Sequence, residues 1–239
     1  MNMLPNEAME MIAALAPLVK DTENEVVLCV PYTDLFYSLL AVQETNIKIG
    51  AQNMHFEEKG AYTGEISGKM LKSIGVQYVI IGHSERRQYF AETDETVNKK
   101  IKAAFLNNLK PIVCVGETLE QREAGIQYDI ITEQTKKALD GLTEDQVANT
   151  IIAYEPKWAI GTGKTATKED ANDACRKIRE KIAQIYGQNV AERVIIQYGG
   201  SMKPENAKEL LEMSDIDGGL IGGASLKAET FEKIVNYNR

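Results

Sequence analysis

The sequence has few of the residues that bind metals or form disulfides. Its 239 residues include three cysteines and two histidines. The cysteines (Cys29, Cys114 and Cys175) show no C-x-x-C spacing, and the first two lie in apolar, strand-like runs. We therefore expect buried free thiols in a reducing cytoplasm. The histidines are far apart and accompany no cysteine pair, so a metal site is not expected.

Long apolar runs and an excess of positive charge are also lacking. The net charge is -8, which argues against a nucleic-acid partner and an anionic membrane surface. No basic residue precedes the apolar stretch from Met11 to Val19, as a signal peptide would require, and no run reaches the roughly 20 residues of a membrane span. We expect a cytoplasmic protein, in which local dipoles would have to hold any anionic substrate.

What the chain does contain is a series of seven short β-branched runs. Most are apolar at consecutive positions, which is typical of strands buried on both faces of a parallel sheet. The runs are Val26–Pro31, Ile47–Asn53, Tyr78–Ser84, Pro111–Glu117, Thr150–Pro156, Arg193–Gly200 and Gly219–Ala224.

Helical patterns separate these runs. Examples are Asn6–Val19, Glu92–Asn107, Leu119–Leu139, Thr167–Tyr186 and Pro204–Met213. Strand-helix alternation predicts the α/β class with a parallel sheet. No linker or shift in composition divides the chain, so residues 1–239 are predicted to form a single domain.

Two architectures compete, an open doubly wound sheet and a closed (β/α)8 barrel. No G-x-G-x-x-G motif follows the first strand, which weakens the dinucleotide-binding form of the open sheet. Polar residues and glycines follow many different strands, as in a barrel whose site lies at the carboxyl ends. Seven strands fall one short of a complete barrel, so we expect that a first strand is missing before Met1.

Two candidate acid–base residues follow middle strands. His83 comes directly after Val79–Gly82, and a neutral imidazole there can donate to a substrate oxygen. The alternative is a turn in a solvated charge run. Glu155 ends the fifth run and could be a general base whose pKa rises on partial burial, or a carboxylate that pairs with a nearby lysine. His55 has no comparable setting and is interpreted as structural.

The segment from Lys157 to Lys164 has the residue types of a closing flap. Pro156 fixes one φ angle before it, and Gly161 and Gly163 free the backbone within it. Trp158 and Ile160 would supply apolar contacts when the flap closes. An ordinary strand-to-helix loop is the alternative interpretation.

Glycine pairs follow the last two strands, as Gly199-Gly200-Ser201 and Gly222-Gly223-Ala224-Ser225. Either pair alone would indicate only a turn. Together they stand where barrels often bind phosphate through backbone N–H groups and a short helix N-terminus. A chain of negative net charge could hold a dianion in this way.

With these residues assembled, the chain resembles the triosephosphate isomerase family along its whole length. The matching segments are GAQN at 50–53, GAYTGEIS at 60–67, IIGHSERR at 80–87, CVGE at 114–117, AYEPKWAIGTGKTA at 153–166, YGGS at 198–201 and IGGASL at 221–226. They occur in the order found in the family, which implies a TIM barrel.

The resemblance implies interconversion of dihydroxyacetone phosphate and glyceraldehyde 3-phosphate through an enediolate. It implies Glu155 as the base and His83 as the neutral electrophile, roles for which this enzyme is a standard example. Phosphate contacts fall to Gly161, Ser201, Gly222 and Gly223, and no cofactor is implied. The loop Gly60–Ser67 resembles the loop through which the family forms homodimers, with Thr63 reaching toward the partner's site.

The chain departs from the family at its start. Family members open with a strand ending in Asn-x-Lys, which is absent here, and Glu85 would lose a partner. Lys157 and Lys164 belong to the flap and neither need point inward, so we do not expect either to replace that lysine.

Two hypotheses follow from this departure. Either this is an isomerase whose recorded start is too late, or it is a truncated, impaired barrel that keeps only sugar-phosphate binding or an assembly role. We favour the first. Barrels acting on phosphoribosyl substrates share the glycine-rich phosphate site, but the Glu155 loop and the His83 motif argue against them.

Overall fold

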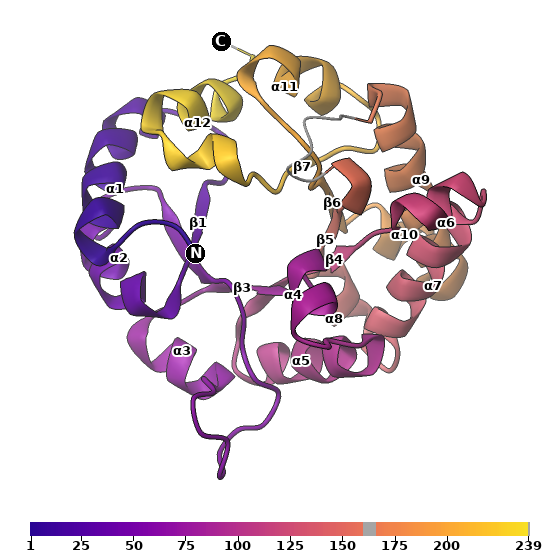
Figure 1. Cartoon of the computed structure of the whole chain (residues 1–239), viewed down its shortest axis with the longest axis horizontal. Helices are drawn as coiled ribbons and strands as arrows, with labels where there is room; N and C mark the ends of the chain where they lie inside the picture. The colour runs from indigo at the N-terminus through magenta and orange to yellow at the C-terminus, as the bar shows by residue number, and fades with distance from the viewer. Residues whose placement is uncertain (160–165, 239) are drawn as a thin grey trace.

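The structure is a computed structural model that describes residues 1–159 and 166–238. Its sheet has seven parallel strands in chain order, curled so that helices lie outside it (Figure 1). The strands are β1 (Val27–Val30), β2 (Lys48–Ala51), β3 (Tyr78–Ile81), β4 (Lys110–Val115), β5 (Ile151–Tyr154), β6 (Ile195–Tyr198) and β7 (Gly218–Gly219). The predicted α/β class and barrel architecture are confirmed.

Helices connect successive strands and cover the outer face of the sheet. The α-helices are α1 (Pro5–Val19), α2 (Leu35–Ala41), α3 (Gly68–Ile74), α4 (Ser84–Tyr89), α5 (Asp94–Leu106), α6 (Leu119–Glu123), α7 (Gln127–Leu139), α8 (Glu144–Ala148), α9 (Lys168–Tyr186), α10 (Gln188–Ala191), α11 (Pro204–Leu211) and α12 (Ala228–Val235). Short 3-10 helices are η1 (Tyr32–Asp34), η2 (Lys157–Ala159) and η3 (Gly223–Leu226). Among the described residues, none of these helices has the length and apolar character needed to cross a bilayer.

Helix ends follow the local signals in the sequence. Thr167 accepts a hydrogen bond from the Asp170 N–H at 3.1 Å and begins α9, while Pro204 occupies the first turn of α11. The predicted helix Leu119–Leu139 is divided into α6 and α7, and Gly125 between them has a φ of 73°. Only glycine adopts that conformation readily, so the helix is interrupted there.

The sheet separates two apolar cores. The larger core lies between the sheet and the helices, and the smaller one lies inside the curl, where Ile80, Ile112 and Ile151 meet. Every residue of β3 and β5 is buried, which explains why these strands read as unbroken apolar runs.

The two edge strands differ from the inner ones. All four residues of β1 and both residues of β7 are only half-buried, and the strand pairing among the described residues runs from β1 to β7 without joining these two. The seventh predicted run, Gly219–Ala224, is mostly not strand, because only Gly218–Gly219 pairs with β6 and η3 follows. The single-domain assignment stays a prediction.

The burial of β5 gives a test of the packing. Ile152 is fully buried, and its replacement by alanine should lower the free energy of unfolding by about 2–5 kcal/mol through lost contacts and a residual cavity. Urea unfolding followed by circular dichroism measures this. The control, Leu106→Ala, removes a side chain that is 69% exposed and should cost less than about 0.5 kcal/mol. Equal costs would contradict the buried position of Ile152.

Candidate active site

Parallel pairing brings the carboxyl ends of the strands to one rim, and the residues predicted for the site lie there. His83 follows β3, Glu155 follows β5, Ser201 follows β6, and the pair Gly222 and Gly223 follows β7. All five line one cavity of about 1510 Å³. The remaining predicted residue, Gly161, lies outside the described residues, as do Ile160, Gly163 and Lys164.

His83 and Glu155 contact each other directly. The His83 Nε2 lies 2.9 Å from Glu155 Oε1, and the second carboxylate oxygen accepts the Ser84 N–H at 3.0 Å. Glu155 is only 2% exposed. The alternative interpretation of Glu155 was a carboxylate paired with a nearby lysine. Its partner in the structure is instead His83, the other predicted acid–base residue.

The position of His83 at the start of α4 defines its tautomer. Its Nδ1 accepts the Glu85 N–H at 3.3 Å, so the side chain caps the helix and, in the neutral ring, this nitrogen carries no proton. The proton is therefore on Nε2, which donates to Glu155. A neutral ring with an Nε2–H directed into the rim is the form that can donate to an oxygen of a bound molecule.

The carboxylate of Glu155 also sets the pKa of His83. Burial by itself lowers this pKa, but the hydrogen bond and negative charge of Glu155, with smaller contributions from Glu85 and Glu92, outweigh burial and raise it. Protonation of His83 is thus tied to the presence of the Glu155 charge.

Two glycines allow the backbone around Glu155 to pack closely. A Cβ at Gly116 would lie 1.8 Å from the Glu155 carbonyl oxygen, and one at Gly199 would lie 2.9 Å from Glu155 Cγ. The Gln134 side chain holds Gly116 by accepting its N–H at 2.8 Å and donating to its carbonyl at 3.3 Å. Sequence reasoning missed Gln134, which is one polar residue on a helix with no local signal.

A second buried carboxylate anchors the segment after Glu155. Glu117 Oε1 accepts the Trp158 Nε1–H at 2.9 Å and the Tyr154 hydroxyl at 3.1 Å. The Arg122 guanidinium lies 3.6 Å from the same oxygen and 4.6 Å from the centre of the Trp158 ring. Trp158 was predicted only to make apolar contacts, but its ring N–H also donates a hydrogen bond to Glu117. The CVGE motif contains Glu117, but its pattern does not reveal this role.

The glycine-rich turn after β7 is open, whereas the one after β6 is closely packed against Tyr198 and Glu155. A Cβ built at Gly222 or Gly223 meets nothing within 4 Å. η3 begins at Gly223, and Ser225 returns two hydrogen bonds to the Gly222 carbonyl, from its N–H at 2.9 Å and its hydroxyl at 2.7 Å. Beside β6, the Ser201 carbonyl accepts from Asn206 at 3.1 Å. The predicted short helix next to the glycine pair is therefore present.

Positive charge at the rim is sparse. Of the described lysines and arginines, Arg86, Lys203 and Lys233 line the cavity, and Arg86 bonds to Glu92 at 2.8 Å. Lys157 is not among the described residues that line it. Burial, followed by the nearby Arg87 charge, lowers the pKa of Lys157.

The remaining histidine and the cysteines lie in ordinary packing environments. The His55 ring stacks on Phe56 at 4.4 Å and approaches Tyr62 at 4.7 Å, which agrees with its interpretation as structural. The three cysteines are unpaired. Cys114 is buried as expected, whereas Cys29, also expected to be buried, is half-buried on an edge strand that lines the cavity; Cys175 is buried as well. Among the described residues, no three carboxylate, histidine or cysteine side chains gather in a metal-binding cluster.

Together, fold and rim define a class: (β/α)-barrel enzymes that place a histidine–carboxylate pair after middle strands and glycine-rich turns after the last two. The sequence profile described as "Triosephosphate isomerase" matches residues 1–238. The chain therefore belongs to the triosephosphate isomerase family, and the resemblance seen in its motifs is confirmed.

Individual relatives agree over nearly the whole chain. Triosephosphate isomerase of Caldanaerobacter subterraneus subsp. tengcongensis is 58% identical over 237 residues, which is 99% of this chain and 96% of the relative. That of Acetivibrio thermocellus is 59% identical over 239 residues, covering 100% and 95%. The crystal structure of the Bartonella henselae triosephosphate isomerase matches with a TM-score of 0.90 and 41% identity, covering 100% of this chain and 96% of that chain.

The His83–Glu155 contact predicts a change in titration. In Glu155→Gln the negative charge is removed while burial remains, so the pKa of His83 should fall. NMR titration of the histidine rings measures this, with His55, the other histidine, as internal reference. An unchanged titration of His83 would contradict the assigned cause.

Proposed function

We propose that the protein interconverts dihydroxyacetone phosphate and glyceraldehyde 3-phosphate, a step of glycolysis and gluconeogenesis. The observation that carries this proposal is the buried Glu155 carboxylate bonded to His83 at the rim of the barrel. Membership of an isomerase family over the whole chain supports it and disfavours a barrel that keeps only a binding role.

In the proposed reaction, Glu155 removes a proton from one substrate carbon and returns it to the adjacent carbon. Its carboxylate is occupied by the His83 Nε2–H and the Ser84 N–H, so it has to exchange at least one of these for the substrate.

The proposed role of His83 is to donate its Nε2–H to the substrate oxygen and stabilise the enediolate. The Glu85 N–H bond to Nδ1 supports this role, because it fixes the tautomer. When Glu155 leaves the ring to act on the substrate, the negative charge that raises the His83 pKa moves with it, which favours the neutral imidazole.

The phosphate group would bind where the last two strands end. We propose backbone contacts from Ser201, Gly222 and Gly223, supported by the open space around both glycines and by the start of η3 there. Gly161 belongs to the same proposal through the family motif. The unpaired cysteines support the proposed location in a reducing cytoplasm.

The role of Glu155 can be tested with Glu155→Asp. Shortening the side chain withdraws the carboxylate by more than about 1 Å, so kcat for glyceraldehyde 3-phosphate should fall at least about 100-fold with circular dichroism unchanged. Conversion of the substrate by the purified protein can be followed by NMR. Glu209→Asp on the exposed side of α11 is the matched control and should keep full activity. Near-normal turnover in Glu155→Asp would refute the assignment.

We also propose a homodimer formed through the loop Gly60–Ser67. This loop projects beyond α3, outside the ring of helices (Figure 1), and residues 59–65 are exposed. Tyr62, with 45% of its surface exposed, would be covered by the partner, and Thr63 would reach toward the partner's site.

Sedimentation velocity tests the dimer. The sedimenting species should have twice the 26.5 kDa mass of one chain. The double replacement Tyr62→Asp, Thr63→Asp should convert the dimer to the monomer, because it places negative charge in the contact. A monomeric wild type, or a dimer unaffected by the replacements, would count against this interface.

A further inference from the structure

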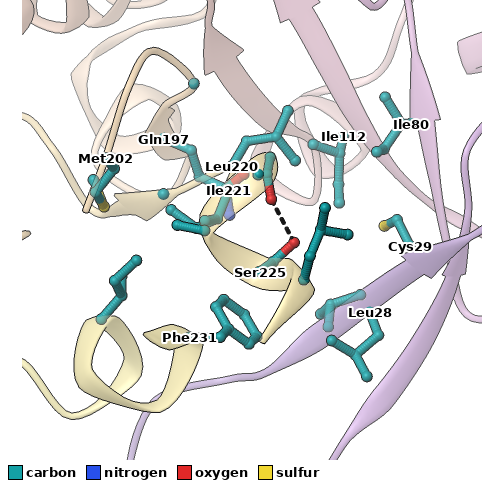
Figure 2. Close-up of a pocket in the computed structure, with 18 of the residues that line it drawn as sticks. Leu28, Cys29, Ile80, Ile112, Gln197, Met202, Leu220, Ile221, Ser225 and Phe231 are labelled. Atoms are coloured by element: carbon teal, nitrogen blue, oxygen red, sulfur yellow. Dashed lines mark hydrogen bonds between the residues drawn. The ribbon is translucent and has the colours of Figure 1, made fainter. Parts of the chain in front are cut away.

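The pairing between β3 and β4 stops before β4 ends. Ile80 lies beside Ile112 on the inner side of the sheet (Figure 2), and the register of these two strands runs as far as Ile81 and Val113. β4 continues to Val115 and stays paired with β5 over that length. The end of β4 that lies next to the site therefore has a strand on one side only.

The backbone groups of Gly116 point to the side that β3 no longer covers. The Val115 carbonyl accepts the Glu155 N–H at 2.7 Å, and the Glu117 carbonyl accepts the Lys157 N–H at 3.1 Å, so the residues on either side of Gly116 face β5. Successive residues of a parallel strand direct their N–H and C=O to opposite neighbours, and Gly116 therefore faces away from β5. Because Gly116 is buried, these groups need partners from outside the sheet.

Gln134 supplies both partners. Its Oε1 accepts the Gly116 N–H at 2.8 Å, and its Nε2 donates to the Gly116 carbonyl at 3.3 Å. A side-chain amide offers an acceptor and a donor together, as the backbone of a neighbouring strand does. Ile131 and Ala138, three residues before and four residues after Gln134 on α7, are buried in the larger core and hold this face of the helix on the sheet.

Gly116 in turn contacts the backbone of Glu155. A Cβ on Gly116 would lie 1.8 Å from the Glu155 carbonyl oxygen and 3.3 Å from its Cα. On the other side, a Cβ on Gly199 would lie 2.9 Å from Glu155 Cγ. Glu155 is therefore held between two glycines, and Gln134 bonds to one of them. Interiors packed this closely transmit small displacements from one residue to the next.

We propose that Gln134 is a positioning residue for Glu155 and acts through Gly116. By bonding both backbone groups of Gly116, it keeps this glycine against the Glu155 backbone. The carboxylate is thereby kept within hydrogen-bond reach of His83, at 2.9 Å. The inference rests on the proposed isomerisation and adds to it a residue from a helix on the outer side of the sheet.

The alternative is a purely structural role, in which Gln134 only satisfies a buried strand end and stabilises the fold. The two roles differ in their effect on the contact between His83 and Glu155. Under the structural role, this contact is unchanged in any variant that folds. Under the positioning role, loss of the two bonds from Gln134 alters the contact although the fold is intact.

The first test uses the pKa of His83 as a measure of this contact. Burial lowers the pKa, whereas the hydrogen bond and charge of Glu155, with smaller contributions from Glu85 and Glu92, raise it. Gln134→Met keeps an unbranched side chain but loses both hydrogen bonds. His83 should therefore titrate at a lower pH in this variant than in the wild type, as measured by NMR titration of the histidine rings.

Thr135→Val is the matched control. Thr135 follows Gln134 on α7, is fully buried, and donates its hydroxyl to the Ile131 carbonyl at 2.7 Å. Valine has nearly the same shape, so this variant loses one buried hydrogen bond within α7 and leaves Gly116 bonded. His83 should titrate as in the wild type. An unchanged titration in Gln134→Met, or an equal shift in Thr135→Val, would overturn the proposal.

Kinetics provide the second test. A displaced base slows the proton transfer, so kcat and kcat/KM for glyceraldehyde 3-phosphate should fall together in Gln134→Met, by at least about tenfold. Thr135→Val should keep the wild-type values. An equal loss of kcat in the two variants would indicate a general disturbance of α7 and would overturn the proposal.

A second substitution covers the case in which Gln134→Met does not fold. Gln134→Glu keeps the acceptor for the Gly116 N–H but, when ionised, has no donor for the Gly116 carbonyl. Its kcat should fall at least about threefold, as expected for the loss of one buried hydrogen bond. Wild-type kcat in a folded Gln134 variant would count decisively against the positioning role.

The two readouts separate this inference from the isomerase assignment. If the wild type converts no glyceraldehyde 3-phosphate, the proposed function fails, and the His83 titration by itself still supports or overturns the role of Gln134. If the wild type is active and the Gln134 variants match it in both turnover and titration, only the positioning role fails.

Discussion

The site depends on the parallel pairing of β3, β4 and β5. Ile80 is in register with Ile112, and Ile112 with Ile151, so the three strands end at one level of the barrel. The residues that follow them, His83, Gly116 and Glu155, are thereby brought together although they are far apart in the chain. The Glu155 N–H bond to the Val115 carbonyl, at 2.7 Å, extends the same ladder to Glu155 itself.

Close packing then fixes the orientation of Glu155. With a Cβ position only 1.8 Å from the Glu155 carbonyl oxygen, residue 116 has to be glycine for β4 and β5 to stay paired to their ends. Gln134 holds this glycine from α7, and Glu117 holds the following Trp158. The carboxylate therefore stands on a rigid support, and the Trp158 ring that follows it in the chain donates to a buried carboxylate.

Much of the fold could be predicted from the sequence because strands buried on both faces leave unbroken apolar runs. The first six runs contain the observed strands, apart from Lys110 at the start of β4. The last run was mostly wrong because its glycine pairs favour turns as much as strand, and only tertiary packing decides between them. The rim positions of His83 and Glu155 were predictable because carboxyl ends of parallel strands share an edge; their roles in the reaction stay predictions.

Contacts between distant side chains could not be predicted in this way. The direct His83–Glu155 bond joins residues whose separation follows no helical or strand period. Gln134 lies 18 residues from Gly116 and Trp158 lies 41 residues from Glu117. Each of these contacts depends on how one helix or loop packs against the sheet. A single sequence contains no periodic pattern that predicts this packing.

The bonds that Glu155 makes to His83 and Ser84 also affect how ligand affinity is to be understood. They stabilise an arrangement in which the carboxylate is engaged internally, and a ligand that needs the carboxylate has to shift the protein out of it. The measured dissociation constant is then larger than the intrinsic one, because it equals the intrinsic constant divided by the fraction of molecules in the released arrangement. Ligands that do not engage Glu155 escape this cost. Two inhibitors with equal contacts to the glycine-rich turns after β6 and β7 can therefore differ in affinity through the resting position of one side chain.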